Sequence, residues 1–148
     1  MNFTVRPIVE TDFVAWSRLW RGYLEFYQTS VSEDVFKASF ARMISAEHPS
    51  QNGFVAAEGD VLVGLVHYIY HPHNWRLENV CYLQDLFVAR DRRTKGVGRA
   101  LIEAVYDAAD ANNTPNVYWL TQDFNTEARK LYDRVAVVTP FIKYYRSM

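Results

Sequence analysis

Two glycines in a basic stretch of the chain, Gly96 and Gly98, have the spacing of a loop that holds an anion. Glycine lets the backbone approach a ligand closely and point free N–H groups at it. The basic side chains around the pair are Arg92, Arg93, Lys95 and Arg99. Where such a loop opens a helix, the positive end of the helix adds to the attraction. The stretch therefore predicts a pyrophosphate site, although a plain basic turn, in which the glycines only start the helix, would use the same residues.

The pattern around these glycines disfavours two common nucleotide loops. The Gly-Lys-Ser/Thr ending of a Walker A loop is absent, and no third glycine follows at the spacing of a dinucleotide motif. The stretch Arg93-Thr94-Lys95-Gly96-Val97-Gly98 instead resembles the Gln/Arg-x-x-Gly-x-Gly/Ala motif of the GNAT N-acetyltransferase superfamily. In that superfamily an apolar strand precedes the motif, as Leu86-Phe87-Val88 precedes it here.

The resemblance extends from His67 to Val135. Over this range the chain is similar to the spermidine/spermine and small histone/polyamine acetyltransferase branch. The segments that carry it are Tyr82-Leu83-Gln84-Asp85-Leu86-Phe87-Val88, Val117-Tyr118-Trp119-Leu120-Thr121 and Asn125-x-x-Ala128-x-x-Leu131-Tyr132. The first ~60 residues match only in their expected strand-helix-helix layout. The resemblance implies one N-acetyltransferase domain over residues 1–148, which moves the acetyl group of acetyl-CoA onto a primary amine by direct attack in a ternary complex. A polyamine-like amine, a lysine side chain or another small amine would be the acceptor.

The resemblance also implies how acetyl-CoA, the donor co-substrate, is held. The backbone of residues 86–88 would pair with the pantetheine arm like an added strand, and the N–H of Leu86 or Phe87 would stabilise the oxyanion. The amides of residues 94–99 would hold the pyrophosphate, and Asn125 would contact the arm near its amide end. Asn125 can also act simply as a helix N-cap. The implied cofactor-binding residues are Leu86, Phe87, Val88, Arg93, Thr94, Lys95, Gly96, Val97, Gly98, Arg99 and Asn125.

Acetyl transfer to nitrogen requires a neutral amine, an oxyanion donor and an acid for the departing thiolate. Tyr132 stands where the family has its tyrosine acid. A phenol with an ordinary pKa of about 10 suits a thiolate of pKa about 8.5 only when the two are held close together. The alternative role of Tyr132 is that of an amphipathic core residue beside Leu131.

Deprotonating the acceptor is the second chemical requirement. An alkylammonium with a pKa of about 10.4 costs about 4.6 kcal/mol to deprotonate at neutral pH, so a base is valuable. Where the polyamine enzymes have a glutamate, this chain has Gln84, which can orient a water but cannot accept a proton. Asp85 could serve if a β-bulge turned it inward, or it could be a hydrogen-bonded structural carboxylate. Gln84 also supports the alternative that the chain is a catalytically weak CoA-binding sensor or regulatory module.

One mixed α/β sheet flanked by helices is expected to position these residues. Apolar alternation predicts strands at residues 3–5, 54–57, 61–70, 80–88, 117–121 and 139–145. Helical spacing predicts helices at about residues 11–27, 32–44, 97–112 and 125–135, the first two capped by Thr11 and Ser32. Residues 58–60, Glu-Gly-Asp, predict a hairpin turn. The resulting order, β-α-α-β-β-β-α-β-α-β, is that of a single-domain GNAT-type sheet.

Three other features have a plain structural interpretation. The aromatic stripe of residues 16, 20, 23 and 27 is typical of core packing, although it could also wall the acceptor groove. His71 and His73 have no Cys, Asp or Glu at ligand spacing, so no metal is expected. Cys81 lies in an apolar run and is expected to be a buried small residue, not a nucleophile.

The composition of the chain limits the classes of partner that it can bind. The chain has 148 residues, 16 Lys and Arg and 17 Asp and Glu, which is the size of one domain and leaves no excess charge to hold nucleic acid or an anionic membrane. The single cysteine and the absence of a signal-like N-terminus favour the cytoplasm. No apolar run approaches the roughly 20 residues that cross a bilayer. The expected partners are a small-molecule or peptide amine and a second copy of the chain in a homodimer, for which residues 141–145 could supply a pairing strand.

Overall fold

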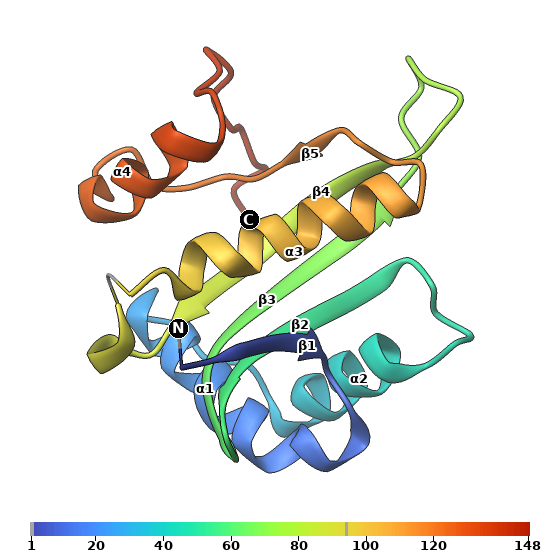
Figure 1. The fold of residues 1–148 in the computed structure, drawn as a ribbon. Coiled ribbons are helices and arrows are strands. Elements are labelled where there is room, and N and C mark those ends of the chain that lie inside the picture. The colour runs from blue at the N-terminus through green and yellow to red at the C-terminus, as the bar shows by residue number, and fades with distance from the viewer. Residues whose placement is uncertain (1, 94) are drawn as a thin grey trace.

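A five-stranded sheet forms the middle layer of the protein, which we describe for residues 2–93 and 95–148 of a computed structural model (Figure 1). The strands lie in chain order, and they are β1 (Thr4–Pro7), β2 (Gln51–Glu58), β3 (Val61–His71), β4 (Val80–Val88) and β5 (Val117–Tyr118). The first three pairings are antiparallel and the β4–β5 pairing is parallel. The expected single-domain mixed α/β sheet is therefore confirmed.

Helices cover both faces of this sheet (Figure 1). They are α1 (Phe13–Phe26), α2 (Glu33–Ile44), α3 (Val97–Ala111) and α4 (Thr126–Val135), with short 3₁₀ turns at Glu10–Asp12 and Arg90–Arg92. One core, which includes Trp16 and Leu65, lies between the sheet and α1 and α2. A second core, which includes Val66 and Leu101, lies under α3 on the opposite face. Each sheet face is thus buried, as the nearly continuous apolar runs of β3 and β4 require.

The first two helices begin in different ways. Ser32 caps α2 as expected, because the amide of Val35 donates to its hydroxyl oxygen at 3.4 Å. Thr11 does not cap α1, which begins at Phe13 after the 3₁₀ turn. The neighbouring Asp12 is instead bound by the guanidinium of Arg6, at 2.8 and 2.9 Å. This bidentate pair ties the start of α1 to β1.

The expected hairpin between residues 58 and 60 is present. Gly59 has a φ of 60°, a conformation that few other residues adopt without strain, and it joins β2 to β3. This turn matters for the site because Glu58, the last residue of β2, forms an ion pair with Arg92 in the 3₁₀ turn that follows β4.

The predicted closing strand at residues 139–145 is wrong. Residues 136–148 contain no helix or strand, and β5 spans two residues in place of the five predicted at 117–121. β-rich residues form a strand only where a partner edge is available, and no strand of the described chain pairs with this segment. As a result Phe141 and Ile142 are 84% and 76% exposed.

Candidate active site

The β4 strand has a free hydrogen-bonding edge over most of its length. β3 pairs with β4 from Val80 to Val88, whereas β5 pairs only with Cys81 and Tyr82. Within the described chain no other strand continues along β4 beyond Tyr82. Backbone groups of residues 86–88, which were expected to hold the pantetheine arm, therefore lie on an open sheet edge where an extended ligand can pair.

The start of α3 lies just beyond the end of β4. Gly96 is its N-cap, with a φ of 85°, and no side chain among the described residues caps the helix. The amide of Ala100 makes the first helical bond, to the carbonyl oxygen of Gly96 at 3.0 Å. The amides of residues 97–99 precede that bond and have no carbonyl partner within the helix. This uncapped end, with its helix dipole, fits a phosphate group.

The two glycines of the loop have different structural roles. A side chain at Gly96 would meet no heavy atom within 4 Å, so its left-handed backbone is the feature that requires glycine. A Cβ at Gly98 would lie 3.2 Å from Cδ2 of Leu131 and 3.7 Å from Cγ2 of Val88. Gly98 therefore makes room for α4 to pack on α3, a role that the glycine spacing alone did not predict.

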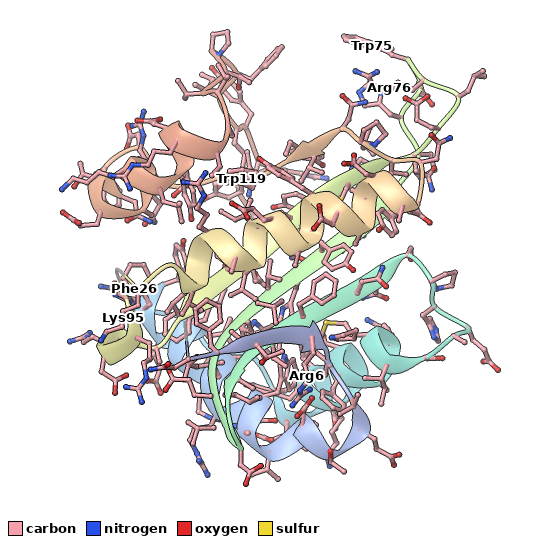
Figure 2. The ribbon with its side chains drawn as sticks, in the orientation of Figure 1. Arg6, Phe26, Trp75, Arg76, Lys95 and Trp119 are labelled. Atoms are coloured by element: carbon pink, nitrogen blue, oxygen red, sulfur yellow. The ribbon has the colours of Figure 1, made fainter. Side chains whose placement is uncertain are left out.

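The basic side chains of the loop are not equivalent. Arg92 is held by Glu58, with its Nε 2.9 Å from both carboxylate oxygens, and Arg99 pairs with Glu103 at 2.7 Å. Lys95 is exposed and forms no ion pair with the other described residues (Figure 2). Lys95 is thus a cation on this loop that can turn toward a phosphate without breaking a described ion pair, a distinction that composition alone cannot make.

Arg93 connects the loop to β4 and α1. Its Nε donates to the carbonyl oxygen of Val88 at 3.1 Å, and its guanidinium carbon lies 5.5 and 5.9 Å from the ring centres of Phe87 and Phe26. Figure 2 shows Phe26 and Lys95 at the same end of the molecule. Thr94, the remaining loop residue assigned to the pyrophosphate, lies outside the described residues.

A bulge in β4 decides which way the candidate base faces. His67 pairs with Asp85 and Tyr68 pairs with Leu83, so Gln84 is the additional residue. Leu83 and Leu86 both contact the core under α3, although strict alternation would place residues three apart on opposite faces. Gln84 is exposed, and Asp85 is buried at 9% exposure and points toward α1. The strand thus carries the β-bulge that was required for the Asp85 side chain to point inward.

Asp85 lies beside a group of tyrosines, which we call the tyrosine cluster: Tyr23 and Tyr27 from α1 and Tyr82 from β4. Burial raises the pKa of Tyr23, and the charge of Asp85 and a hydrogen bond with it raise that pKa further. Burial and then the charge of Asp85 raise the pKa of Tyr27. Burial, the neighbouring phenol of Tyr118 and then the charge of Asp85 raise the pKa of Tyr82. Neither Tyr82 nor His67 was among the site residues predicted from the sequence, and both stand in apolar runs.

Tyr132, the candidate acid, approaches this cluster from α4. Burial, with a smaller effect from the phenol of Tyr27 at the C-terminal end of α1, raises its pKa to about 12. The ring of Trp119 packs edge-on against it at 5.5 Å between ring centres. Tyr132 of α4 is therefore near Tyr27, which is itself near the Asp85 carboxylate of β4.

Asn125 is the N-cap residue of α4, but its side chain does not cap the helix. Its amide nitrogen lies 3.3 Å from the hydroxyl oxygen of Thr121. The simple capping role is therefore wrong, and the cofactor contact stays a prediction.

The remaining candidates have structural roles. Trp16 and Trp20 are core residues, so the front of the aromatic stripe packs as expected. Burial raises the pKa of the Cys81 thiol to about 12, which keeps it protonated. In residues 2–93 and 95–148 no group of three or more His, Cys, Asp or Glu side chains is placed to hold a metal ion. No helix in these ranges has the length and apolar character of a membrane span.

The chain belongs to the acetyltransferase (GNAT) family, whose model matches residues 14–136. It is 39% identical over 148 residues to the D-amino-acid N-acetyltransferase HPA3 of Saccharomyces cerevisiae, covering 99% of this chain and 91% of that protein. It is 27% identical over 130 residues to the uncharacterized N-acetyltransferase YhfO of Bacillus subtilis, covering 88% and 86% of the two chains. The protein is thus an N-acetyltransferase that takes the acetyl group from acetyl-CoA and transfers it to an amine.

Solved structures support the same fold. The aminoglycoside acetyltransferase AAC(6')-Iy in complex with a bisubstrate analogue has a TM-score of 0.86 at 19% identity, covering 100% of this chain and 99% of that one. The aminoglycoside acetyltransferase meta-AAC0020 from a soil metagenomic sample, in complex with sisomicin, has a TM-score of 0.81 at 16% identity, covering 99% and 97%. The narrower resemblance to the polyamine and histone branch is not confirmed by these relatives.

Proposed function

We propose that this acetyltransferase acts on the primary amine of a small molecule, with a free amino acid as the preferred acceptor. The observation that carries the proposal is the buried Asp85 carboxylate of β4 beside the tyrosine cluster, with Tyr132 of α4 near Tyr27 of that cluster. The nearly full-length relative that acetylates D-amino acids supports this acceptor class. Polyamine-like amines and lysine side chains, which the sequence resemblance implied, are the acceptors to compare.

The buried charges support an acceptor with one ammonium group at the site. Asp12 and Asp85 are the buried acids of the described residues, and Asp12 is neutralised by Arg6. Asp85 is left without a Lys or Arg partner in the described structure. A buried carboxylate of this kind attracts an ammonium group, because its own charge is otherwise costly to bury.

The proposed chemistry assigns one step to each group. Asp85 takes the first proton from the acceptor ammonium, and the freed nitrogen attacks the acetyl carbonyl carbon. The N–H of Leu86 or Phe87 stabilises the oxyanion. When the carbon–sulfur bond breaks, Tyr132 protonates the thiolate and recovers a proton from the nitrogen as the amide forms. In total, one ammonium and one thioester give one amide, one thiol and one released proton. Gln84 has a separate role and orients water at the exposed bulge.

Donor binding in this proposal uses main-chain groups. Residues 86–88 pair with the pantetheine arm along the open edge of β4, and the amides at the start of α3 hold the pyrophosphate with help from Lys95. Arg93 shapes the loop through the Val88 carbonyl, and Asn125 contacts the arm. The uncapped start of α3 supports the phosphate assignment most directly.

The acceptor assignment is tested by thiol release from acetyl-CoA across D- and L-amino acids, polyamines, lysine peptides and aminoglycosides. We expect the highest kcat/KM for a free amino acid. Asp85→Asn, which keeps the side-chain shape, should lower kcat for every acceptor, whereas Glu25→Gln on the exposed side of α1 is the matched control. A polyamine or a lysine peptide with the highest kcat/KM would overturn the acceptor assignment. Acetyl-CoA binding without thiol release for any acceptor would favour the sensor alternative.

We also propose that the protein forms a homodimer through its C-terminal segment. Large apolar side chains are exposed there, and they are Val137, Val138, Phe141, Ile142, Tyr144, Tyr145 and Met148. Exposed apolar groups gathered in this way are typical of an interface. An extended segment can add to a sheet edge, and β5 pairs on one side only within the described chain. Each copy supplies both a segment and an edge, so a second copy is the fitting partner.

Light scattering after gel filtration tests the dimer. Phe141→Asp combined with Ile142→Asp should give monomers, and because both residues are exposed in the single chain, the monomer should keep its fold. Lys143→Ala, in the same segment, is the control and should leave the dimer unchanged. A monomeric unmodified chain at micromolar concentration would contradict the proposal.

A further inference from the structure

A chain of two buried hydrogen bonds leads from α1 to the candidate base. Nε1 of Trp16 donates to Nε2 of His67 at 2.9 Å, and Nδ1 of His67 lies 2.8 Å from Oδ2 of Asp85. All three side chains are buried, and they come from α1, β3 and β4. The residues are distant in sequence, with a separation of 51 in residue number for the first two and 18 for the last two.

The first of these bonds fixes the protonation state of the imidazole. An indole N–H can only donate, so Nε2 of His67 must accept and cannot carry a proton of its own. The ring proton of a neutral imidazole then resides on Nδ1, from which it is donated to Asp85. The negative charge of the trio therefore stays on Asp85, and one of its two oxygens is held by His67.

The surroundings of the trio add no positive charge. Trp20 lies with its ring 5.6 Å from that of His67 and Trp16 stacks on Trp20 at 5.2 Å, while Tyr23 and Tyr27 from α1 and Tyr82 from β4 face Asp85. Tryptophan and protonated tyrosine are neutral. None of the described groups facing Asp85 from these elements competes with an incoming ammonium as a counter-charge.

We propose that Trp16 and His67 are positioning residues that hold Asp85 as a charged, correctly aimed carboxylate, so that Asp85 and not His67 receives the proton of the acceptor amine. This inference rests on the proposed amine acetylation and deepens it. His67 donates its Nδ1 proton to Oδ2 throughout and does not exchange it during turnover. The other carboxylate oxygen takes the ammonium proton, the nitrogen keeps the electron pair, and the proton is released to solvent after the product leaves.

Removing the indole donor tests this assignment. Trp16→Phe leaves Nε2 of His67 open to protonation, and a protonated His67 beside Asp85 would neutralise the base. We expect the kcat of Trp16→Phe to fall in acidic solution and to recover as the pH rises, because the open Nε2 can then bind a proton. Trp20→Phe is the matched control, because the Nε1 of Trp20 is buried without a hydrogen-bond partner among the described residues. Its profile should stay that of the unmodified enzyme.

Nitrogen NMR of the histidine side chains gives a readout that does not depend on the acceptor. We expect the unmodified protein to hold His67 as the neutral Nδ1–H tautomer, and Trp16→Phe to lose this fixed tautomer. His67→Asn, whose amide can still donate to Asp85, should keep more kcat than His67→Leu at unchanged KM for acetyl-CoA. A charged His67 in the unmodified protein, or identical pH profiles for Trp16→Phe and Trp20→Phe, would overturn the inference.

These results also separate this inference from the proposed function. If the acceptor assignment is wrong, we still expect the same NMR result. We also expect the same difference between Trp16→Phe and Trp20→Phe when the assay uses the amine that is acetylated. If the positioning role is wrong, Asp85→Asn still lowers turnover while His67 titrates in the unmodified protein.

Discussion

Leu131 of α4 lies against Gly98 in the first turn of α3, with its Cδ2 3.2 Å from the point where a side chain at position 98 would begin. The next residue in α4 is Tyr132. The absence of a side chain at one loop position therefore sets how closely the candidate acid approaches β4, and the loop influences catalysis through packing as well as through phosphate binding.

Gly98→Ala should lower kcat several-fold with little loss of stability. The added methyl group displaces Leu131 by a few tenths of an ångström, whereas alanine in a helix gains about 0.5–1 kcal/mol over glycine. Gly96→Ala is the comparison, because its positive φ costs roughly 1–2 kcal/mol while no atom is contacted. Urea denaturation and steady-state kinetics separate the two variants. An unchanged kcat for Gly98→Ala would show that α4 position is not limiting.

Tyr132→Phe should lower kcat by about 10²–10⁴-fold and leave the KM for acetyl-CoA nearly unchanged, because general acid catalysis typically contributes that much. The ring keeps its contact with Trp119, so the fold should be preserved. Stopped-flow thiol release and thermal unfolding are the measurements. Turnover at the unmodified rate would remove Tyr132 from the mechanism.

Stability should fall in alkaline solution as the buried tyrosines ionise. The pKa of Tyr132 is raised from 10 to about 12 in the folded protein. The folded state therefore binds the proton more tightly than the unfolded state, and the stabilisation is complete below pH 10 and is lost as the pH rises toward 12. Denaturant unfolding of the unmodified protein and Tyr132→Phe should show their stability difference shifting over this range. Tyr144→Phe, in the exposed C-terminal segment, should track the unmodified protein instead.

Lys95→Ala and Arg92→Ala should have different consequences. Lys95 is free to meet a phosphate, so its loss should raise the KM for acetyl-CoA about fivefold at low salt and less at high salt, as expected for an exposed charge pair. Arg92 holds the loop to Glu58, so its loss should mainly increase loop exchange. Kinetics at two ionic strengths and hydrogen exchange distinguish them. Equal KM changes for both would contradict the distinction.

The elements and the donor loop could be predicted from the sequence because they depend on local patterns. Apolar runs identified β3 and β4, and Gly59 and Gly96 stand at positive φ where the turn and the helix start were expected. The hydrogen-bonded trio could not be predicted, because Trp16, His67 and Asp85 meet only through the register of β3 and β4. Residues 139–145 show the opposite error, since strand propensity cannot supply the partner edge on which a strand depends.

The additional residue at Gln84 has a consequence for comparing relatives. Successive side chains along a strand point to opposite faces of the sheet. One inserted residue therefore moves every side chain on one side of the insertion to the opposite face. Removing Gln84 would leave Asp85, Tyr132 and the donor loop in the chain but would place either Asp85 or Leu83 on the wrong face. A single-residue deletion, and not any substitution, is therefore the smallest change that would convert this sequence into a folded protein with its carboxylate turned into the α3 core.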